Sequence, residues 1–420
     1  MRGLAKYVAV AMVVCSGAIF ASRVNAAEIL TLEEATDRAL RIAPAVESAI
    51  AQGDLNDARV DEARAPLYPN IEANGEYNQA PGYDQTISNR GLTLAQLSLS
   101  YTAYDGGRRD SQMRSMRYQA EAARLGIKAA RAQIVFDVSV AYFDLVRQRQ
   151  TEKEIAQSIN RLDVYVRIVE SLQRSGRAIA NDVLKIRATR DSARLALAGI
   201  QLAGAHASIV LGSMIGEFGQ RDLEPAQITT LPPPPNGEIT ESPVYRAASR
   251  QIDAAKLMVR AAEAERSPTL KVALTSGFEG IDPPKTFGHH LGASYDGAIS
   301  VPIFEGGLIR AHIDQARATE RNAVAQTRQV ERDLKRDLAD ASEQYQSAAE
   351  QLALLAQSQS TADDSFALDW ARFLGGGNVT LLEATDAYQQ AENLRLMRFE
   401  QEFAARRATA QARLLLGLAV

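Results

Sequence analysis

Stretches in which apolar and polar residues alternate predict four β-strands. Between Leu97 and Tyr104, leucine, tyrosine and alanine alternate with serine and threonine, and from Ile71 to Asn78 apolar residues alternate with glutamate and asparagine. This period of two is typical of strands whose faces meet different surroundings. The second half of the chain repeats the pattern at 270–278 and 291–304. We therefore expect two β-hairpins, at about 69–104 and at about 268–304.

Long proline-free runs with apolar residues every three or four positions predict helices. Two long helices are expected, each followed by a returning one, at 108–175, 182–216, 308–373 and 379–417. In the first, a 4, 3, 4, 3 spacing connects Ile155, Ile159, Leu162, Val166 and Val169. The mean period of 3.5 keeps one seam facing a partner helix, as in coiled coils. At about 1.5 Å per residue this helix is roughly 100 Å long, too long for one globular core.

One structural unit occurs twice in the chain. Asp-Gly-Gly at 105–107 follows a strand and precedes a long helix, and Glu-Gly-Gly at 305–307 does the same 200 residues later. Asp105 is the expected N-cap of its helix. The repeat predicts two similar halves, joined by a proline-rich linker that we interpret as a stiff extended connector. The boundaries are 27–216 for the first repeat, 217–241 for the linker and 242–420 for the second repeat.

Residues 1–26 have the pattern of a secretory signal peptide. Arg2 and Lys6 precede an apolar run, and small residues favour cleavage after Ala26. The single cysteine, Cys15, lies inside this leader, and we expect no lipid on it because Val14 stands where a lipoprotein signal has glycine or alanine. The mature chain then has no disulfide. The net charge of −4 and the pI of about 5.8 give no reason to expect a nucleic-acid partner.

After the leader no run of about 18 apolar residues occurs, so we expect membrane spans only from the strands. Their polar faces carry too many charges for a dry core, at Glu72, Glu76, Lys271 and Asp296, whereas their other faces suit lipid. Four strands cannot close, since the smallest outer-membrane barrels need eight and open edges are costly in hydrocarbon. We therefore predict that identical chains pool their strands, with these four residues in the barrel lumen. A soluble sheet is the alternative.

These features resemble the TolC family of outer-membrane efflux and secretion channels. The resemblance rests on Leu-Thr-Leu-Glu-Glu-Ala at 30–35 with Pro44, on the run from Ala65 to Pro69, on both acid-Gly-Gly junctions, and on Gly176 followed by Asp-Val-Leu at 182–184. It implies an α+β membrane protein, a homotrimer with a twelve-stranded barrel in the outer membrane of a Gram-negative bacterium. Its long antiparallel coiled-coil hairpins would form a periplasmic tunnel.

The resemblance also implies partners. They are outer-membrane lipid, a periplasmic adaptor of the membrane fusion class and an inner-membrane pump of the RND, ABC or MFS type. The chain would be the exit duct of a tripartite efflux pump or a type I secretion system.

The same resemblance places the narrowest part of the tunnel at the hairpin tips, where acidic rings close it in the family. Carried over by position, Asp182 and Glu383 are the acids of this aperture, and Thr380 stands where the family has a further acid. Helix capping by Asp182 and a solvated charge at Glu383 are the alternatives. Asn378 or Gly376 falls where some members have arginine. Packing at the tip, or alternatively contact with the adaptor, is expected of Phe366, Trp370 and Phe373.

No pattern of catalytic or cofactor-binding residues emerges. The glycines before Asn378 lack the lysine and the Ser/Thr of a phosphate-binding loop, and the four histidines are scattered. We therefore expect no enzymatic activity, no cofactor and no metal site. A non-conducting coiled-coil scaffold of the cell envelope, or a periplasmic adaptor, is the alternative function. It accounts for the helices but not for the strands.

Overall fold

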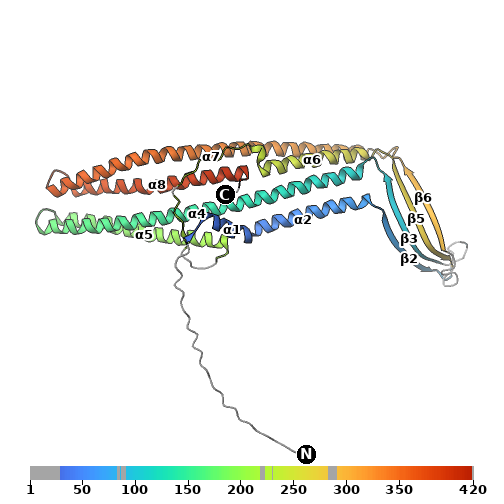
Figure 1. The fold of residues 1–420 in the computed structure, drawn as a ribbon, viewed down its shortest axis with the longest axis horizontal. Coiled ribbons are helices and arrows are strands. Elements are labelled where there is room, and N and C mark those ends of the chain that lie inside the picture. Colours follow the sequence, from blue (N-terminus) through green and yellow to red (C-terminus); the bar gives the residue numbers. More distant parts are fainter. Residues whose placement is uncertain are drawn as a thin grey trace, which may run out of the picture.

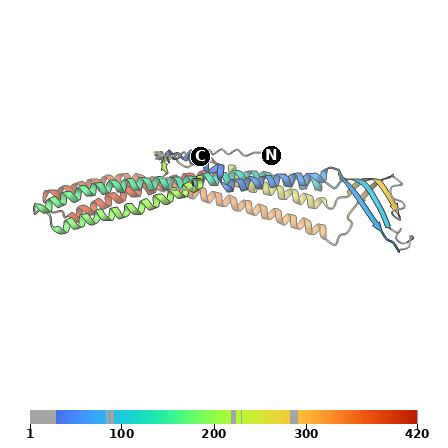
Figure 2. The ribbon, with the colours of Figure 1, turned by 90° about the horizontal axis from the view of Figure 1, so that it is seen from below.

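The computed structural model describes residues 29–82, 86, 91–217, 223–228, 230–281 and 291–418. The leader predicted at 1–26 lies outside these residues. The molecule is long, with helices along most of its length and a β-sheet at one end (Figure 1). Seen from below, the helices form a thin layer and the strands run obliquely to them (Figure 2).

The sheet has four antiparallel strands in the order β2-β3-β5-β6. Each predicted hairpin forms, and the two join through β3 and β5. The last strand was predicted to reach residue 304 but ends at Ser300, opposite Thr269, where its partner β5 begins. Pro302 follows, which has no backbone N–H to donate. The bounds are β2 Asn70–Gln79, β3 Gly91–Tyr104, β5 Thr269–Ile281 and β6 Leu291–Ser300.

The helices lie side by side in one layer. Away from the sheet the order across the layer is α7, α8, α4, α5, and towards the sheet it is α7, α6, α4, α2 (Figure 1). The long helices α4 and α7 therefore run through both parts, and each shorter helix packs beside one of them. The bounds are α1 Leu32–Ile42, α2 Pro44–Arg64, α4 Arg108–Arg174, α5 Ala180–Ile215, α6 Pro243–Ala264, α7 Leu308–Gly375 and α8 Leu381–Leu416.

The start of α4 corrects the predicted N-cap. Gly107, with φ 84°, occupies the N-cap position instead of Asp105. The Asp105 carboxylate nevertheless accepts hydrogen bonds from the backbone N–H groups of Gly107 and Arg109, both at 3.1 Å. It also accepts from Arg109 Nε at 2.8 Å, and the Arg109 guanidinium reaches the carbonyls of Pro66 and Thr102. Because Gly106 and Gly107 both adopt left-handed conformations, Asp105 lies two residues before the N-cap position. Its carboxylate still binds free N–H groups at the start of the helix.

The linker packs against the helices instead of standing free. In the described part, β4 Glu224–Pro225 pairs in parallel with β1 Ile29–Leu30. The Tyr142 hydroxyl of α4 donates to the Leu30 carbonyl at 2.9 Å, and the Thr409 hydroxyl of α8 donates to the Pro232 carbonyl at 2.9 Å. The linker therefore contacts the first repeat through β1 and the second repeat through α8, at the middle of the molecule.

Candidate functional site

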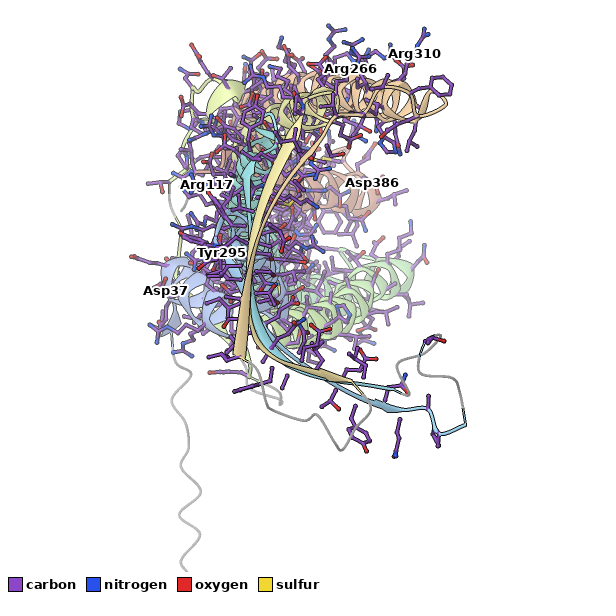
Figure 3. All side chains as sticks on the ribbon, turned by 90° about the vertical axis from the view of Figure 1, so that its right-hand side faces the viewer. Asp37, Arg117, Arg266, Tyr295, Arg310 and Asp386 are labelled. Carbon is purple, nitrogen blue, oxygen red and sulfur yellow. The ribbon has the colours of Figure 1, made fainter. Side chains whose placement is uncertain are left out.

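The sheet has one charged face and one apolar face. Glu72 lies opposite Ser98, which lies opposite Thr275. The same register places Glu76, Lys271 and Asp296 on that face, because side chains two residues apart point the same way. Bare apolar side chains cover the opposite face, among them Ile71, Leu97, Tyr295 and Ile299. The sheet is curved when seen from its end, with Tyr295 on the nearest strand (Figure 3).

Among the described strands, β2 and β6 each pair on one side only. Their outer backbone groups pair with no other strand in the part of the chain that the structure describes. Because unpaired edges are not tolerated in lipid, a sheet with this apolar face requires further strands to enter a membrane.

The two helix hairpins end in turns that carry the predicted aperture residues. Asp182 is the third residue of α5, and its carboxylate accepts a hydrogen bond from the Ile179 N–H at 3.1 Å. Glu383 is the third residue of α8 and accepts from the Thr380 N–H at 2.7 Å, while the Thr380 hydroxyl accepts from the Glu383 N–H at 3.3 Å. The second arrangement is a capping box. Both acids therefore stabilise the start of a returning helix.

Thr380 aligns with Asp182 by the repeat offset of 198, but the two residues have different positions in their helices. Since α5 begins at Ala180 and α8 at Leu381, the helix starts are offset by 201, and Asp182 shares its capping position with Glu383. The hydrogen bonds from the Thr380 backbone and hydroxyl hold the pKa of Glu383 below its usual value. Glu383 is fully exposed, so this carboxylate carries its charge at the hairpin tip at neutral pH.

Residues 376 and 378, where the family resemblance led us to look for an arginine, are glycine and asparagine. Gly376 is the left-handed C-cap of α7, with φ 76°. A different arginine reaches this region: Arg177, in the turn between α4 and α5, donates to the carbonyl of Leu374 near the end of α7. The sequence analysis missed this contact between the two hairpin tips, because no local pattern identifies the acceptor.

A second group of contacts fastens the two hairpins behind the tip. The hydroxyls of Ser158 on α4 and Tyr388 on α8 lie 2.7 Å apart, and the Tyr388 hydroxyl donates to the Ser158 carbonyl at 3.2 Å. Burial raises the pKa of Tyr388, so its hydroxyl stays protonated. Arg161 on α4 donates to Glu392 on α8 at 2.9 Å and to Glu154 at 2.8 Å. Burial works against the charged form of Arg161, but these bonds outweigh it and raise its pKa.

The tip aromatics pack within the chain. Tyr165 of α4 lies 5.5 Å from Phe366 and 4.5 Å from Trp370, measured between ring centroids, and Trp370 lies 5.7 Å from Phe373. All three predicted residues are half-buried against an apolar cluster that includes Leu162 of the first hairpin. Each also keeps exposed surface, so packing and contact with a partner are compatible.

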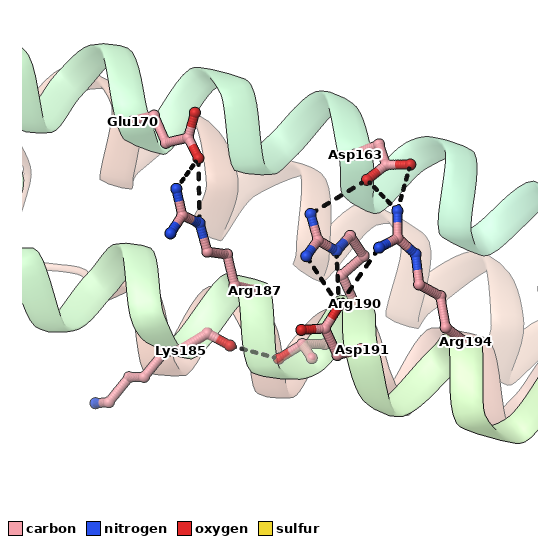
Figure 4. A network of polar contacts seen from close by, with 8 residues as sticks. Asp163, Glu170, Lys185, Arg187, Arg190, Asp191 and Arg194 are labelled. Atoms are coloured by element: carbon pink, nitrogen blue, oxygen red, sulfur yellow. Dashed lines mark hydrogen bonds and ion pairs between the residues drawn. The ribbon is translucent and has the colours of Figure 1, made fainter.

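Ion pairs join α4 to its returning helix α5. Arg190 and Arg194 of α5 both approach Asp163 of α4, at 3.6 and 3.3 Å, and Arg187 binds Glu170 at 2.6 Å (Figure 4). These side chains are partly exposed, and such pairs contribute on the order of 0–1 kcal/mol each. Because these pairs follow one another along the two helices, together they favour one rotation of α5 about its own axis relative to α4.

The helix α5 leaves an apolar seam uncovered. A 3, 4 spacing of leucine, alanine and isoleucine runs from Leu195 to Ile209, and Leu195 and Leu202 on this seam are 76% and 74% exposed. Among the described helices, α5 alone has the length and composition of a membrane span, contrary to the expectation that none would follow the leader. Its many alanines raise the mean hydropathy, but the large apolar side chains lie on a stripe, which suits packing against another helix.

Within the described residues no group of three or more His, Cys, Asp or Glu side chains is placed to hold a metal ion. The polar clusters of the hairpins are structural ion pairs and capping interactions, and none joins a nucleophile to a base.

Comparison with known proteins identifies the family. Residues 35–217 and 237–418 match the family described as Outer membrane efflux protein. The chain is 26% identical over 310 residues to protein CyaE of Bordetella pertussis, with 69% of this chain and 63% of CyaE covered. It is 25% identical over 322 residues to outer membrane protein TolC of Escherichia coli, with 69% and 62% covered. The match therefore spans less than two thirds of either relative.

Solved structures share the fold. The outer membrane protein VceC from Vibrio cholerae superimposes with a TM-score of 0.81 at 18% identity, covering 92% of this chain and 96% of VceC. CusC gives a TM-score of 0.83 at 19% identity, covering 92% of each chain. The family match includes both repeats and nearly the whole described chain, and the family is one of transport channels. The chain belongs to the outer membrane efflux protein family.

Proposed function

We propose that the protein is the outer-membrane exit duct of a tripartite efflux pump or type I secretion system. The observation that carries this proposal is the curved four-stranded sheet with one charged face, one bare apolar face and two open edges. A membrane channel built from several such sheets uses all three features, since lipid covers the apolar face, water fills the charged lumen and neighbouring chains pair the edges. A scaffold that conducts nothing uses none of them.

The proposed assembly is a homotrimer with a twelve-stranded barrel and a periplasmic helical tunnel. The family resemblance supplies the number three. The uncovered seam of α5 lies at one edge of the layer and α7 lies at the other (Figure 1). A contact between two different edges joins chains head to tail and forms a ring when the rotation between neighbouring chains closes. Glu72, Glu76, Lys271 and Asp296 would then line the barrel lumen.

The proposed partners are a periplasmic adaptor and an inner-membrane pump. One relative is named as a pyoverdine export outer membrane protein of Pseudomonas aeruginosa, and BepC of Brucella suis as an outer membrane efflux protein. A passive duct accepts what its pump delivers, so the choice of cargo lies with the RND, ABC or MFS type partner.

The proposed aperture lies at the hairpin tips, with Asp182 and Glu383 repeated by the symmetry of the trimer. Such rings of carboxylates favour cations and slow their passage. Both acids also cap helices, and suitable variants separate the two roles. Asn and Gln at these positions remove the charge but keep an acceptor for the capping bond, whereas Ala removes both.

The experiment is single-channel recording of the purified protein in planar bilayers, together with electrophoresis of unheated and heated samples. We expect a heat-sensitive trimer that conducts, and a relief of block by divalent cations in Asp182→Asn and Glu383→Gln. Asp340→Asn, an exposed acid of α7 far from the tip, is the matched control and should leave the block unchanged. A protein that stays monomeric or passes no current contradicts the duct, and unchanged block in both tip variants contradicts the aperture alone.

A further inference from the structure

A cavity of about 160 Å³ lies at the middle of the molecule, where both repeats meet the linker. Its walls come from the start of α1, from α4 around Phe136, from three linker residues and from the end of α8 (Figure 1). We propose that this cavity binds a small amphipathic anion, an aromatic or short acyl carboxylate, whose carboxylate binds to arginines of α8. The inference goes beyond the proposed function, because it uses neither the sheet nor the hairpin tips.

Apolar side chains form most of the walls of this cavity. Val135 and Phe136 of α4, Ile228 of the linker and Leu414 of α8 line it, and the buried ring of Phe143 connects it to a hydrophobic core. A dry cavity of about 150 Å³ with such walls holds one benzene ring. The volume therefore fits a single ring or a short acyl chain, and it is too small for the drug-sized ligands that occupy sites of about 300–1,000 Å³.

Two hydroxyl groups on the walls already have acceptors. The Ser139 hydroxyl of α4 donates to the Val135 carbonyl at 2.6 Å, and the Thr409 hydroxyl of α8 donates to the Pro232 carbonyl at 2.9 Å. Polar recognition of a ligand between these helices then depends on charged side chains.

Arg406 of α8 is a buried cation on the cavity wall, and only 6% of this residue is exposed. Its Nη2 donates to the Ile228 carbonyl at 3.0 Å and to the Glu402 carboxylate at 3.3 Å, whereas its Nε has no hydrogen-bond partner among the described residues. A buried donor without a partner is unfavourable and rare in folded proteins. The guanidinium therefore keeps hydrogen-bonding capacity that a ligand with an anionic oxygen can use.

A second arginine lies on the same face of α8. Arg413 follows Arg406 by seven residues, about two helical turns, and both line the cavity. Arg413 is half-buried, and among the described residues no acid forms an ion pair with it. Of the described side chains that line the cavity, these two are cationic and none is acidic. Since the nearby Glu402 balances at most one of the two positive charges, the cavity attracts an anion.

Apolar walls and two arginines together select an amphipathic carboxylate. A guanidinium presents parallel N–H groups that match the two oxygens of a carboxylate. A neutral ring of the same size leaves the arginines unpaired, and inorganic phosphate would lose its hydration without filling the apolar space. Because the walls belong to both repeats and to the linker, a bound anion contacts all three and raises the midpoint of thermal unfolding by mass action.

Fluorine NMR of the purified protein in detergent tests the cavity, with para-fluorobenzoate as the probe and para-fluorobenzamide as its neutral match. We would compare the parent protein with Arg413→Gln, which removes one cation, and with Ala410→Phe, which fills the cavity but keeps both arginines. Arg407→Gln is the matched control, because Arg407 is an exposed arginine of α8 that does not line the cavity. Thermal unfolding of each protein, with and without benzoate, shows whether the variant is folded and whether the ligand stabilises it.

We expect para-fluorobenzoate to bind and to be displaced by unlabelled benzoate and hexanoate, and the benzamide to bind at least about tenfold more weakly. Arg413→Gln should weaken benzoate binding about tenfold, Ala410→Phe should abolish it, and Arg407→Gln should leave it unchanged. Equal binding of benzoate and benzamide, unchanged binding in Arg413→Gln, or no binding to the folded parent protein overturns the proposal. Displacement by inorganic phosphate as effective as that by benzoate overturns it too. Arg413→Gln decides the outcome if Ala410→Phe does not fold, and none of these results bears on conduction by the proposed duct.

Discussion

The hydroxyl of Tyr388 offers a sharp test of whether the contact between the two hairpins restrains opening of the proposed tunnel. This side chain is 4% exposed, and its hydroxyl bridges α8 to the hydroxyl and carbonyl of Ser158 on α4. In Tyr388→Phe the ring remains to pack against Tyr165 and Phe366, while both polar contacts disappear. The same hydroxyl also interacts with Arg161 of α4, so the variant removes polar links between α8 and α4 and keeps the ring.

The magnitude follows from the two bonds lost. Each contributes about 0.5–1.5 kcal/mol net, so the arrangement in the structure loses about 1–3 kcal/mol per chain relative to one in which the two hairpins separate. Since about 1.4 kcal/mol is a factor of ten, the ratio of separated to joined tips should rise roughly fivefold to 150-fold in each chain. If the three proposed chains open together, the factors multiply to roughly a hundredfold or more.

Single-channel recording measures this ratio as the fraction of time spent in the high-conductance state. Tyr345→Phe is the matched control, because the Tyr345 hydroxyl donates to the Leu231 carbonyl of the linker at 3.3 Å and does not connect the hairpins. It loses one hydrogen bond, about 0.5–1.5 kcal/mol, and should leave the opening unchanged. An unchanged open fraction in a folded, trimeric Tyr388→Phe channel refutes the assignment of this contact as a restraint on opening.

Three further predictions concern the sheet and its junction. Arg109→Ala removes the partner of Asp105 and should lower the free energy of unfolding by about 2–4 kcal/mol in denaturant titrations, whereas Arg114→Ala, at an exposed pair, should cost under about 1 kcal/mol. Burial opposes ionisation of Asp105, but the bonds from Arg109 outweigh this effect and lower the pKa of the Asp105 carboxyl. The stabilisation by the ionised carboxylate is therefore complete above about pH 4 and is lost as the pH falls through the folded-state pKa. Asp105→Asn should flatten this acid dependence of the melting temperature. Gly277→Ala should reduce the folded channel recovered from membranes, because its Cβ would lie 2.3 Å from a backbone oxygen of β3, whereas Gly292→Ala meets no atom within 4 Å and should be neutral.

Much of the fold could be predicted because local signals agree along the chain. The alternation at 97–104 and the 3.5 period at 155–169 depend only on neighbouring residues, and both elements form. Helix ends were accurate where glycine ends the run, as at Gly176 and Gly376. The repeat offset predicts two equivalent hairpins, and both are present in the sheet.

The remaining features depend on contacts that no local pattern encodes. The pairing of β1 with β4 joins two-residue strands almost 200 positions apart, too short to leave a period. The bond between Ser158 and Tyr388 depends on the rotation of one hairpin against the other, which side-chain spacing does not specify. The capping role shared by Asp182 and Glu383 was obscured because the returning helices begin at different points of the repeat.

The covalent connection between the repeats also affects how the proposed ring of chains responds to dilution. Because the linker at 217–241 joins the two repeats covalently, the pairing of β3 with β5 forms at an effective concentration that the length of the chain sets. This effective concentration does not depend on the amount of protein. In the proposed assembly, only the contacts between different chains depend on the protein concentration. In the proposed barrel, this covalent connection halves the number of seams that form by collision between chains. It also lets corresponding positions of the two repeats differ: Arg109 secures the junction in the first repeat, while Ile309 occupies the corresponding place in the second.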